Sequence, residues 1–262
     1  MKRQRLNWQE KVRKNMRKIM DFEHVKAVFE EYLNGYDREN DKVKLKIVHT
    51  YGVIRCSEEI GRRMGLQAED MELAKLIALL HDIGRFEQLK RFNSFEADTM
   101  DHATYGVQVL FEEGMIRQFI EEDTWDDVIR TAIAKHSDYE LTGITDERTL
   151  LHARLIRDAD KLDNCRVKLE DAMETLLDLS ADEVGKYAIS PKVREDAFAG
   201  KCICSKDRRT PMDYWVSYVA YFYDLNFRET LDIVAEEQYV KRIIGRVPYT
   251  NEQTKKTMEE LE

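Results

Sequence analysis

The feature that most constrains this chain is the dipeptide His81-Asp82, which stands at the end of an apolar segment. Apolar residues in the range 74–83 are spaced as on one face of a helix, and Gly84 is the expected helix end because glycine tolerates a left-handed backbone. An imidazole and a carboxylate are costly to bury unless a charged, coordinating group lies opposite them. We therefore expect a divalent metal ion opposite this pair.

Four other residues along the chain have side chains that suit the same cation: His49, His102, His136 and Asp160. Each lies in or at the edge of a segment with helical spacing, so the set can converge from different helices on one cavity. A single histidine on an apolar helix face is more often structural than a ligand, whereas the whole series favours a common site. Asp160 borders an apolar stripe, where pairing with a cation is the simplest explanation for a carboxylate.

Several polar neighbours are not expected to share this ion. His152 precedes Asp160 by eight residues, a rise of about 12 Å along a helix, so the two do not bind one ion together. Asp158 is two positions from Asp160 and points away from it. Asp163 lies on the adjacent face and is placed to support a ligand, and His24 is expected to be structural or exposed.

The order of a histidine, the His-Asp dipeptide and a later aspartate resembles the HD superfamily of metal-dependent phosphohydrolases, which has a helical fold. The resemblance covers about residues 20–175, and its most specific parts are the segments 81–84 and 158–163. It implies that one metal ion is bound by His49, His81, Asp82 and Asp160. The two further histidines, His102 and His136, resemble the subset that holds a second ion, with Asp82 as the bridge. The Gly-Tyr-Pro signature of the branch that hydrolyses cyclic di-GMP is absent.

The composition favours an all-α fold. With three prolines and eleven glycines in 262 residues, long helices with short connections fit better than a turn-rich β architecture, and the 35% charged content indicates a soluble globular protein. We predict a multi-helix HD-domain bundle with extra C-terminal helices packed on the same core. Its expected parts are a basic N-terminal helix (1–20), an HD-type metal-binding core (21–175) and a C-terminal extension of the same domain (176–262).

Helical spacing predicts individual elements within this bundle, over 22–33, 41–65, 125–136, 147–170 and 213–244. Three stretches are expected to be less regular. Residues 86–99 read as a loop or short helix over the cavity mouth, 180–212 as loop-rich, and 251–262 as a polar end that frays.

Charge and hydropathy indicate which classes of binding partner and which cellular compartment are expected. The net charge of −9 argues against a general nucleic-acid binder. The basic segment before residue 20 is read as a solvated helix packed on the body, with contact to a phosphate-bearing surface or a membrane as the alternative. The chain contains no uninterrupted run of about 18 apolar residues, so no membrane span is predicted. The first residues lack the apolar core of a secretory signal. Four scattered cysteines imply no disulfide framework. These features favour the cytoplasm.

The ligand types indicate the chemistry. Imidazole and carboxylate without thiolate suit one or two ions of manganese, iron, cobalt, nickel or zinc, and several histidines argue against magnesium alone. Such an ion lowers the pKa of a bound water, and a second stabilises the leaving oxygen. We predict hydrolysis of a phosphomonoester or phosphodiester in a small phosphorylated substrate, with nucleotides among the candidates.

The predicted catalytic residues are His81, Asp82, Arg85 and Lys161. No glycine-rich phosphate loop is present, so metals and basic side chains must neutralise the phosphate. Arg85 and Lys90 suit that role, with a surface salt bridge as the alternative for each. Lys161 either neutralises phosphate or holds a nearby carboxylate. A basic cluster either closes over an anionic substrate or is a solvated loop; it consists of Lys201, Lys206, Arg208 and Arg209.

Three other functions fit the same residues. Some proteins of the HD fold that resemble this histidine count hold mixed-valence di-iron and cleave carbon bonds with oxygen, which predicts an iron-dependent, oxygen-consuming activity. A regulatory module that binds nucleotide without turnover predicts tight binding and no product. A purely structural metal site predicts loss of the fold on chelation. Cys202 and Cys204 lack a second matching pair, so they do not predict a zinc site.

Overall fold

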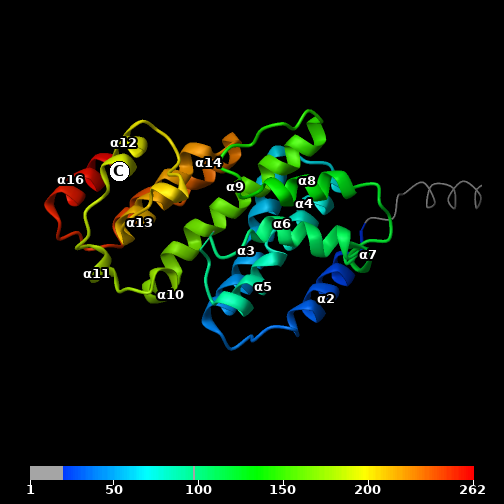
Figure 1. Cartoon of the computed structure of the whole chain (residues 1–262). Helices are drawn as coiled ribbons and strands as arrows, with labels where there is room; N and C mark the ends of the chain where they lie inside the picture. The colour runs from blue at the N-terminus through cyan, green and yellow to red at the C-terminus, as the bar shows by residue number, and fades with distance from the viewer. Residues whose placement is uncertain (1–19, 97) are drawn as a thin grey trace, which may run out of the picture.

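Every regular element in the described part of the chain, residues 20–96 and 98–262 of a computed structural model, is a helix (Figure 1). The all-α prediction is therefore confirmed. The predicted basic helix over residues 1–20 lies, except for Met20, outside the described residues. Within the described residues no helix is both long enough and apolar enough to cross a membrane.

The first half of the chain folds into helices of different lengths around one apolar core. This first core consists mainly of residues between 25 and 162 and contains Phe29, Leu80 and Ile133, among others. Its elements are α2 (Phe22–Leu33), α3 (Asp41–Met64), α4 (Ala68–Leu80), α5 (Ile83–Phe92), α6 (His102–Val107), the π-helical turn η1 (Gln108–Glu112), α7 (Ile116–Phe119) and α8 (Asp126–Lys135). The predicted helices over 22–33, 41–65 and 125–136 agree with these bounds to within one residue.

The long helix α9 (Glu147–Glu170) is the element that both halves of the molecule share. Its 24 residues begin after Asp146, whose carboxylate accepts a hydrogen bond from the backbone N–H of Thr149, and they match the predicted range. The N-terminal part packs on α3 and α8 in the first core. The C-terminal part, from Cys165 onward, packs in a second core.

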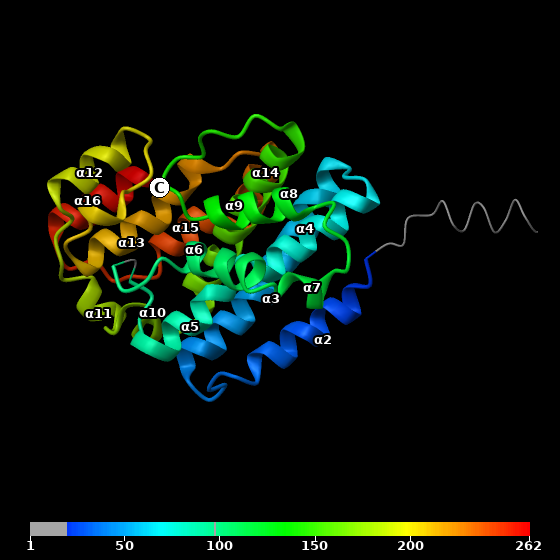
Figure 2. The ribbon, with the colours of Figure 1, turned by 45° about the vertical axis from the view of Figure 1, so that its right-hand side comes forward.

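The second core gathers the C-terminal helices around Trp215, Val216 and Met212, which are fully buried. The elements that follow α9 are α10 (Met173–Leu177), α11 (Ala181–Val184), α12 (Pro191–Phe198), the 3-10 turn η2 (Ser205–Asp207), α13 (Pro211–Ala220), the 3-10 turn η3 (Tyr221–Asp224), α14 (Arg228–Glu236), α15 (Tyr239–Ile244) and α16 (Glu252–Leu261). In both ribbon views α11, α12, α13 and α16 lie at one end of the molecule, and α2 and α7 lie at the other (Figure 1, Figure 2).

Helix α14 returns to the first core, where Ile233 and Val234 are buried. Asp158 of α9 fixes the start of α14, because its carboxylate accepts hydrogen bonds from the backbone N–H groups of Asn226 and Phe227 and from the hydroxyl of Thr230. Asp158 therefore points away from Asp160, as expected, and joins the two halves of the chain.

Two local predictions differ from the structure. Gly84 does not end a helix in the left-handed conformation: α4 ends at Leu80, and Gly84 lies inside α5. The C-terminal end does not fray either: α16 is capped by Asn251 and buries Met258 completely, since its apolar side packs in the second core. The stretch 86–99, by contrast, agrees with the expected loop or short helix, because the short helix α5 continues to Phe92 and the described residues after it are irregular.

Candidate metal centre

The structure brings all six predicted ligands together from five separate elements. His81 and Asp82 form the link between α4 and α5, so the dipeptide lies where one helix ends and the next begins. The remaining four come from the middle of α3, the start of α6, the residue after α8 and the middle of α9; they are His49, His102, His136 and Asp160. All four imidazoles are at most 5% exposed.

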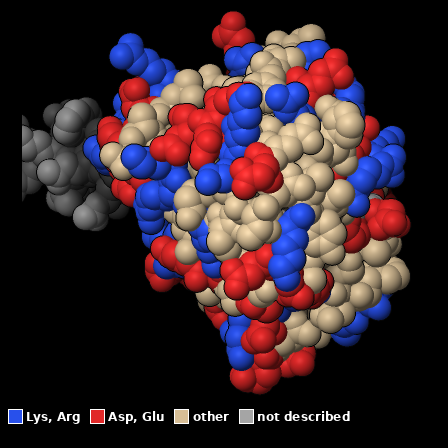
Figure 3. All heavy atoms as spheres, turned by 90° about the vertical axis from the view of Figure 1, so that its left-hand side faces the viewer, with Lys and Arg blue, Asp and Glu red and all other residues tan. Residues whose placement is uncertain are grey.

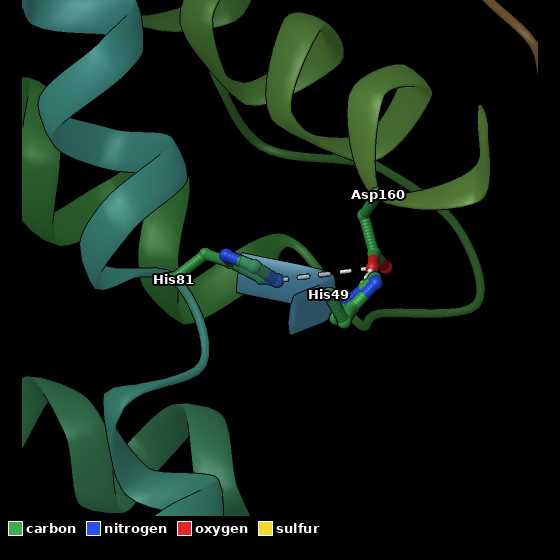
Figure 4. Close-up of side chains that lie close together, drawn as sticks. All are labelled: His49, His81 and Asp160. Atoms are coloured by element: carbon green, nitrogen blue, oxygen red, sulfur yellow. Dashed lines mark hydrogen bonds and ion pairs between the residues drawn. The ribbon is translucent and has the colours of Figure 1, made fainter. Parts of the chain in front are cut away.

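The first group of the centre consists of His49, His81 and Asp160 (Figure 4). The Nε2 atom of His49 lies 2.9 Å from Oδ1 of Asp160, and that of His81 lies 3.7 Å from the same oxygen. The candidate ligand atoms of these three residues all lie within 4.8 Å of one another. This spacing fits coordination of a single ion.

The second group surrounds Asp82. Its Oδ1 lies 3.2 Å from Nε2 of His102 and 3.5 Å from Nε2 of His136. Its other oxygen, Oδ2, lies 3.4 Å from Nε2 of His81 and 3.9 Å from that of His49. The two oxygens of one carboxylate thus point toward two different pairs of imidazoles, which is the arrangement a carboxylate needs to bridge two cations.

The hydrogen bonds behind the imidazoles fix which nitrogen is free. The Nδ1 atom of His81 lies 2.8 Å from the carbonyl oxygen of Ala78, and that of His136 lies 2.7 Å from the carbonyl oxygen of Ile133. Because a carbonyl oxygen only accepts, both Nδ1 atoms carry a proton, so Nε2 is the atom through which each ring could bind a metal ion. His49 Nδ1 likewise faces the carboxylate of Asp163 at 2.8 Å.

These residues fit a divalent transition metal. His81 Nε2 and Asp82 Oδ1 are buried atoms without a hydrogen-bond partner among the described residues, and both point into the centre. Buried polar atoms are normally paired, so unpaired ones at a point where ligand atoms converge indicate a place for a cation. The nitrogen and oxygen donor set, without sulfur, suits manganese, iron, cobalt, nickel or zinc.

The electrostatics of the centre favour a positive charge. Burial works to raise the pKa of Asp82, but Lys46 and His81 outweigh it and hold that pKa well below its usual value. Burial opposes ionisation of Asp160 too, yet the contacts of its carboxylate with His49 and His81 keep its pKa well below the usual value. Burial works to lower the pKa of His81, but Asp82 and Asp160 raise it to about 9. In the metal-free protein a proton on His81 thus supplies charge that a metal ion would otherwise supply.

Sequence reasoning missed two residues that support the ligands. Lys46, on α3 one turn before His49, is buried and forms an ion pair with Oδ2 of Asp82. The spacing of three residues between Lys46 and His49 places both on one helix face, which was the available signal. Gly84 is the second: a Cβ atom there would lie 2.2 Å from the carbonyl oxygen of His102. Glycine therefore allows α5 and α6 to approach so closely that His102 reaches Asp82.

The centre opens into a cavity of about 1030 Å³, which both halves of the chain line. Arg85 lines it, donates hydrogen bonds to Gln88 and to the carbonyl oxygen of Phe95, and has its Nε 3.6 Å from Oδ1 of Asp82. Lys161 also lines it but forms an ion pair of 2.7 Å with Asp224, so it holds a carboxylate.

The other residues predicted to contact phosphate differ in their position relative to the cavity. Lys90 contacts the carbonyl oxygen of Gly35 and the ring of Tyr36, away from the cavity lining, so the alternative of a surface contact describes it better. In the basic cluster, Lys206, Arg208 and Arg209 line the cavity, whereas Lys201 does not. His152 lies outside the centre, with its Nε2 3.1 Å from Asp70.

Comparison with known proteins agrees with this geometry. The family model of the HD domain matches residues 47–165, a range that contains all six converging residues. Ribonuclease Y of Acetivibrio thermocellus is 29% identical over 165 residues, which cover 60% of this chain and 27% of that relative. No solved structure matches the chain. The matched family model, the helical fold and the order of histidines and aspartates agree, so residues 47–165 of this chain are similar to the HD domain family.

Proposed function

We propose that this protein is a metal-dependent hydrolase that cleaves a phosphomonoester or phosphodiester in a small phosphorylated molecule, with nucleotides as the leading candidates. The observation that carries the proposal is the position of Asp82. Its two oxygens face two pairs of buried imidazoles, and the centre opens into a cavity lined by basic side chains. A purely structural metal site needs no such cavity.

The chain's own residues divide the work in the proposed reaction. His49, His81, Asp82, His102, His136 and Asp160 hold one or two transition-metal ions. When bound, these ions act as Lewis acids on the phosphoryl oxygens and lower the pKa of a bound water. Arg85 and Lys46 border Asp82 and line the cavity, so their cationic groups are placed to bind phosphoryl oxygens. Lys161 and Arg157 of α9 both form ion pairs with Asp224, and these ion pairs connect α9 to the cavity wall that contains Asp224.

A small substrate fits the distribution of charge better than a nucleic acid strand. Figure 3 shows that acidic and basic side chains are interspersed on the face at the end of the molecule where the C-terminal helices lie. Among the described residues, that face carries no continuous basic stripe of the kind that binds a phosphate backbone. Basic side chains instead line the cavity beside the centre.

We also propose that residues 21–175 form the metal-binding core and that 176–262 extend the same domain. Two contacts support this division: α9 belongs to both cores, and α14 packs back on the first. The cytoplasm is the proposed compartment, supported by Cys56, Cys165, Cys202 and Cys204, which are all free thiols.

Metal analysis joined to a substrate panel tests the function. Protein purified without added metal is analysed by inductively coupled plasma mass spectrometry and assayed against phosphomonoesters, phosphodiesters and nucleotides. Asp82→Asn keeps the shape of the side chain but removes the charge, so we expect loss of metal and a fall in turnover of roughly 10³-fold. Asp182→Asn, at an exposed position of α11, is the matched control and is expected to behave as wild type.

Three outcomes would contradict the hydrolase. Equal hydrolysis by wild type and Asp82→Asn would show that the centre is not catalytic. Bound iron with oxygen consumption and no phosphoester cleavage would favour the di-iron oxygenase, which the histidine-rich ligand set also suits. Tight nucleotide binding without product would favour a regulatory module.

A further inference from the structure

One face of α9 carries polar residues from the metal centre toward the second core. Asp160, Asn164 and Lys168 follow one another at intervals of four residues and all line the cavity. The amide nitrogen of Asn164 donates to Oδ1 of Asp160 at 3.0 Å, and its amide oxygen lies 3.4 Å from Nζ of Lys168. The Lys168 ammonium is therefore separated from the centre by one amide group.

Lys168 is a buried cation that forms no ion pair with any described carboxylate. It is 8% exposed, and it contacts the Asn164 amide and the ring of Tyr218, whose centroid is 4.3 Å from Nζ. Lysine is rarely buried unless it is paired, and the described residues supply no paired anion for this ammonium.

A second buried cation makes this position more costly. Burial and the nearby charge of Lys46 lower the pKa of Lys168 to about 8, although Asp160 and Asp171 oppose the shift. Lys46 forms an ion pair with Asp82, whereas Lys168 forms no ion pair with a described residue. A bound anion beside Lys168 would relieve both the desolvation and the repulsion between the two ammonium groups.

The carboxylates of the cavity wall are already engaged. Asp224 pairs with Arg157 and Lys161, Asp178 with Lys42, and Asp138 with Lys135, while Glu96 accepts a hydrogen bond from the hydroxyl of Tyr214. Of the other carboxylates that line the cavity, Asp101 accepts hydrogen bonds from Thr104, and Asp82 and Asp160 belong to the metal centre.

The C-terminal segment adds unpaired cations to the same cavity. Arg208 lies over the ring of Tyr214 at 4.3 Å, and its Nε is a buried atom without a hydrogen-bond partner among the described residues. Lys206 and Arg209 flank it and likewise form no ion pair with a described residue. This segment contributes none of the six ligands, so its cations add to the positive charge that Lys46 and Arg85 supply beside Asp82.

We propose that Lys168 and Arg208 form a second anion subsite of the cavity, which binds a phosphate group of the substrate other than the one at the metal centre. Arg85 and Lys46 adjoin Asp82 and serve the group at the centre, whereas the Asn164 amide separates Lys168 from it. The inference rests on the proposed function and specifies its substrate class: molecules that carry two phosphate groups. The cavity of about 1030 Å³ has room for a ligand of that size.

Calorimetry with two phosphonates that the enzyme cannot hydrolyse tests the subsite. The full chain with the metal it retains on purification is titrated with propane-1,3-diphosphonate and with propylphosphonate, which has one anionic group on the same carbon chain. We expect wild type to prefer the diphosphonate by about tenfold or more, because a charge-assisted contact contributes this much. Lys168→Met removes the ammonium at nearly constant shape and is expected to abolish most of this preference.

Control variants separate the subsite from general effects. Lys255→Met removes an exposed lysine of α16 and should keep the preference, and Lys168→Arg should restore much of it. Arg208→Met, in a partly exposed segment, should reduce it independently if Lys168→Met does not fold. Metal content is measured after each titration, so that loss of metal to the diphosphonate is not counted as a loss of the subsite.

The outcomes also separate this inference from the proposed function. An unchanged preference in folded Lys168→Met, or no preference in wild type, overturns the subsite even if phosphoesters are hydrolysed. A preference that depends on Lys168 supports the subsite even if no phosphoester is cleaved, in which case only the proposed hydrolysis fails.

Discussion

The two cores of this protein contribute different things to one cavity. The first core supplies all six converging histidines and aspartates, on elements that lie far apart in the sequence. The second core supplies none of them, but its segment over 205–210 brings cations that no described carboxylate pairs with. The proposed chemistry therefore depends on residues of the first core, and the proposed second anion subsite depends on the part of the cavity wall that the second core completes. Changes in the two cores should therefore have separable effects on stability, metal binding and substrate affinity.

The largest expected effect tests the second core. Met258→Ala removes a completely buried side chain from α16, and such truncations cost about 2–5 kcal/mol. We expect urea unfolding to show this loss while the metal content of the folded protein stays unchanged. A change below about 0.5 kcal/mol, the range typical of surface substitutions, would mean that the C-terminal end frays after all.

The next effect concerns the first core. Gly84→Ala forces a Cβ toward the carbonyl oxygen of His102, 2.2 Å away, and overpacking of this kind costs about 1–3 kcal/mol. Because the strain falls on α6, metal affinity should fall together with stability. Gly35→Ala is the control, since its added Cβ would meet only an ordinary contact at 3.5 Å. If Gly84→Ala keeps wild-type metal affinity, α6 does not need this close approach to position His102.

A third change should affect metal binding more than stability. Asp163→Asn weakens the contact that orients His49, and loss of such a supporting hydrogen bond typically lowers metal affinity about 10- to 100-fold. Competition with a chromogenic chelator measures the affinity. Arg166 also binds the Asp163 carboxylate, so Arg166→Gln indicates how much of the effect comes from that ion pair instead.

The smallest expected effect is a dependence of stability on pH. Burial lowers the pKa of His152, although Asp70 opposes the shift. The folded protein therefore binds fewer protons at His152 than the unfolded chain does, and stability is lost as the pH falls below the ordinary histidine value toward the folded pKa. We expect the free energy of unfolding to fall more between pH 7 and pH 5 in wild type than in His152→Gln. Equal losses in the two proteins would assign the pH dependence to other groups.

Helical periodicity was enough to predict much of the fold. The ranges 22–33 and 147–170 match α2 and α9, because a buried stripe and a capping residue are local signals. The end of the chain was misjudged because α16 is polar overall and buries few side chains, Met258 among them. Its stability comes from packing against a second core that the sequence does not reveal locally.

Some residues of the candidate site could likewise be predicted from the sequence, and others could not. The six histidines and aspartates could be selected from their residue types, their order and the resemblance to a family, and the structure brings them together. Lys46 and Lys168 were not selected, because lysines are common and only the tertiary structure shows that these two are buried beside one cavity. The part played by Gly84 depends on a contact between α5 and α6 that no local pattern encodes.

One uninterrupted helix, α9, carries both Asp160 and Lys168, so their separation is set by a rise of about 1.5 Å per residue. A single inserted residue after Asn164 would turn Lys168 by about 100° and out of the cavity, while Asp160 stayed in place. If Lys168 belongs to the proposed anion subsite, α9 fixes the distance between that subsite and the metal centre. A substrate with a different spacing between its phosphate groups would then have to be accommodated by the wall opposite α9.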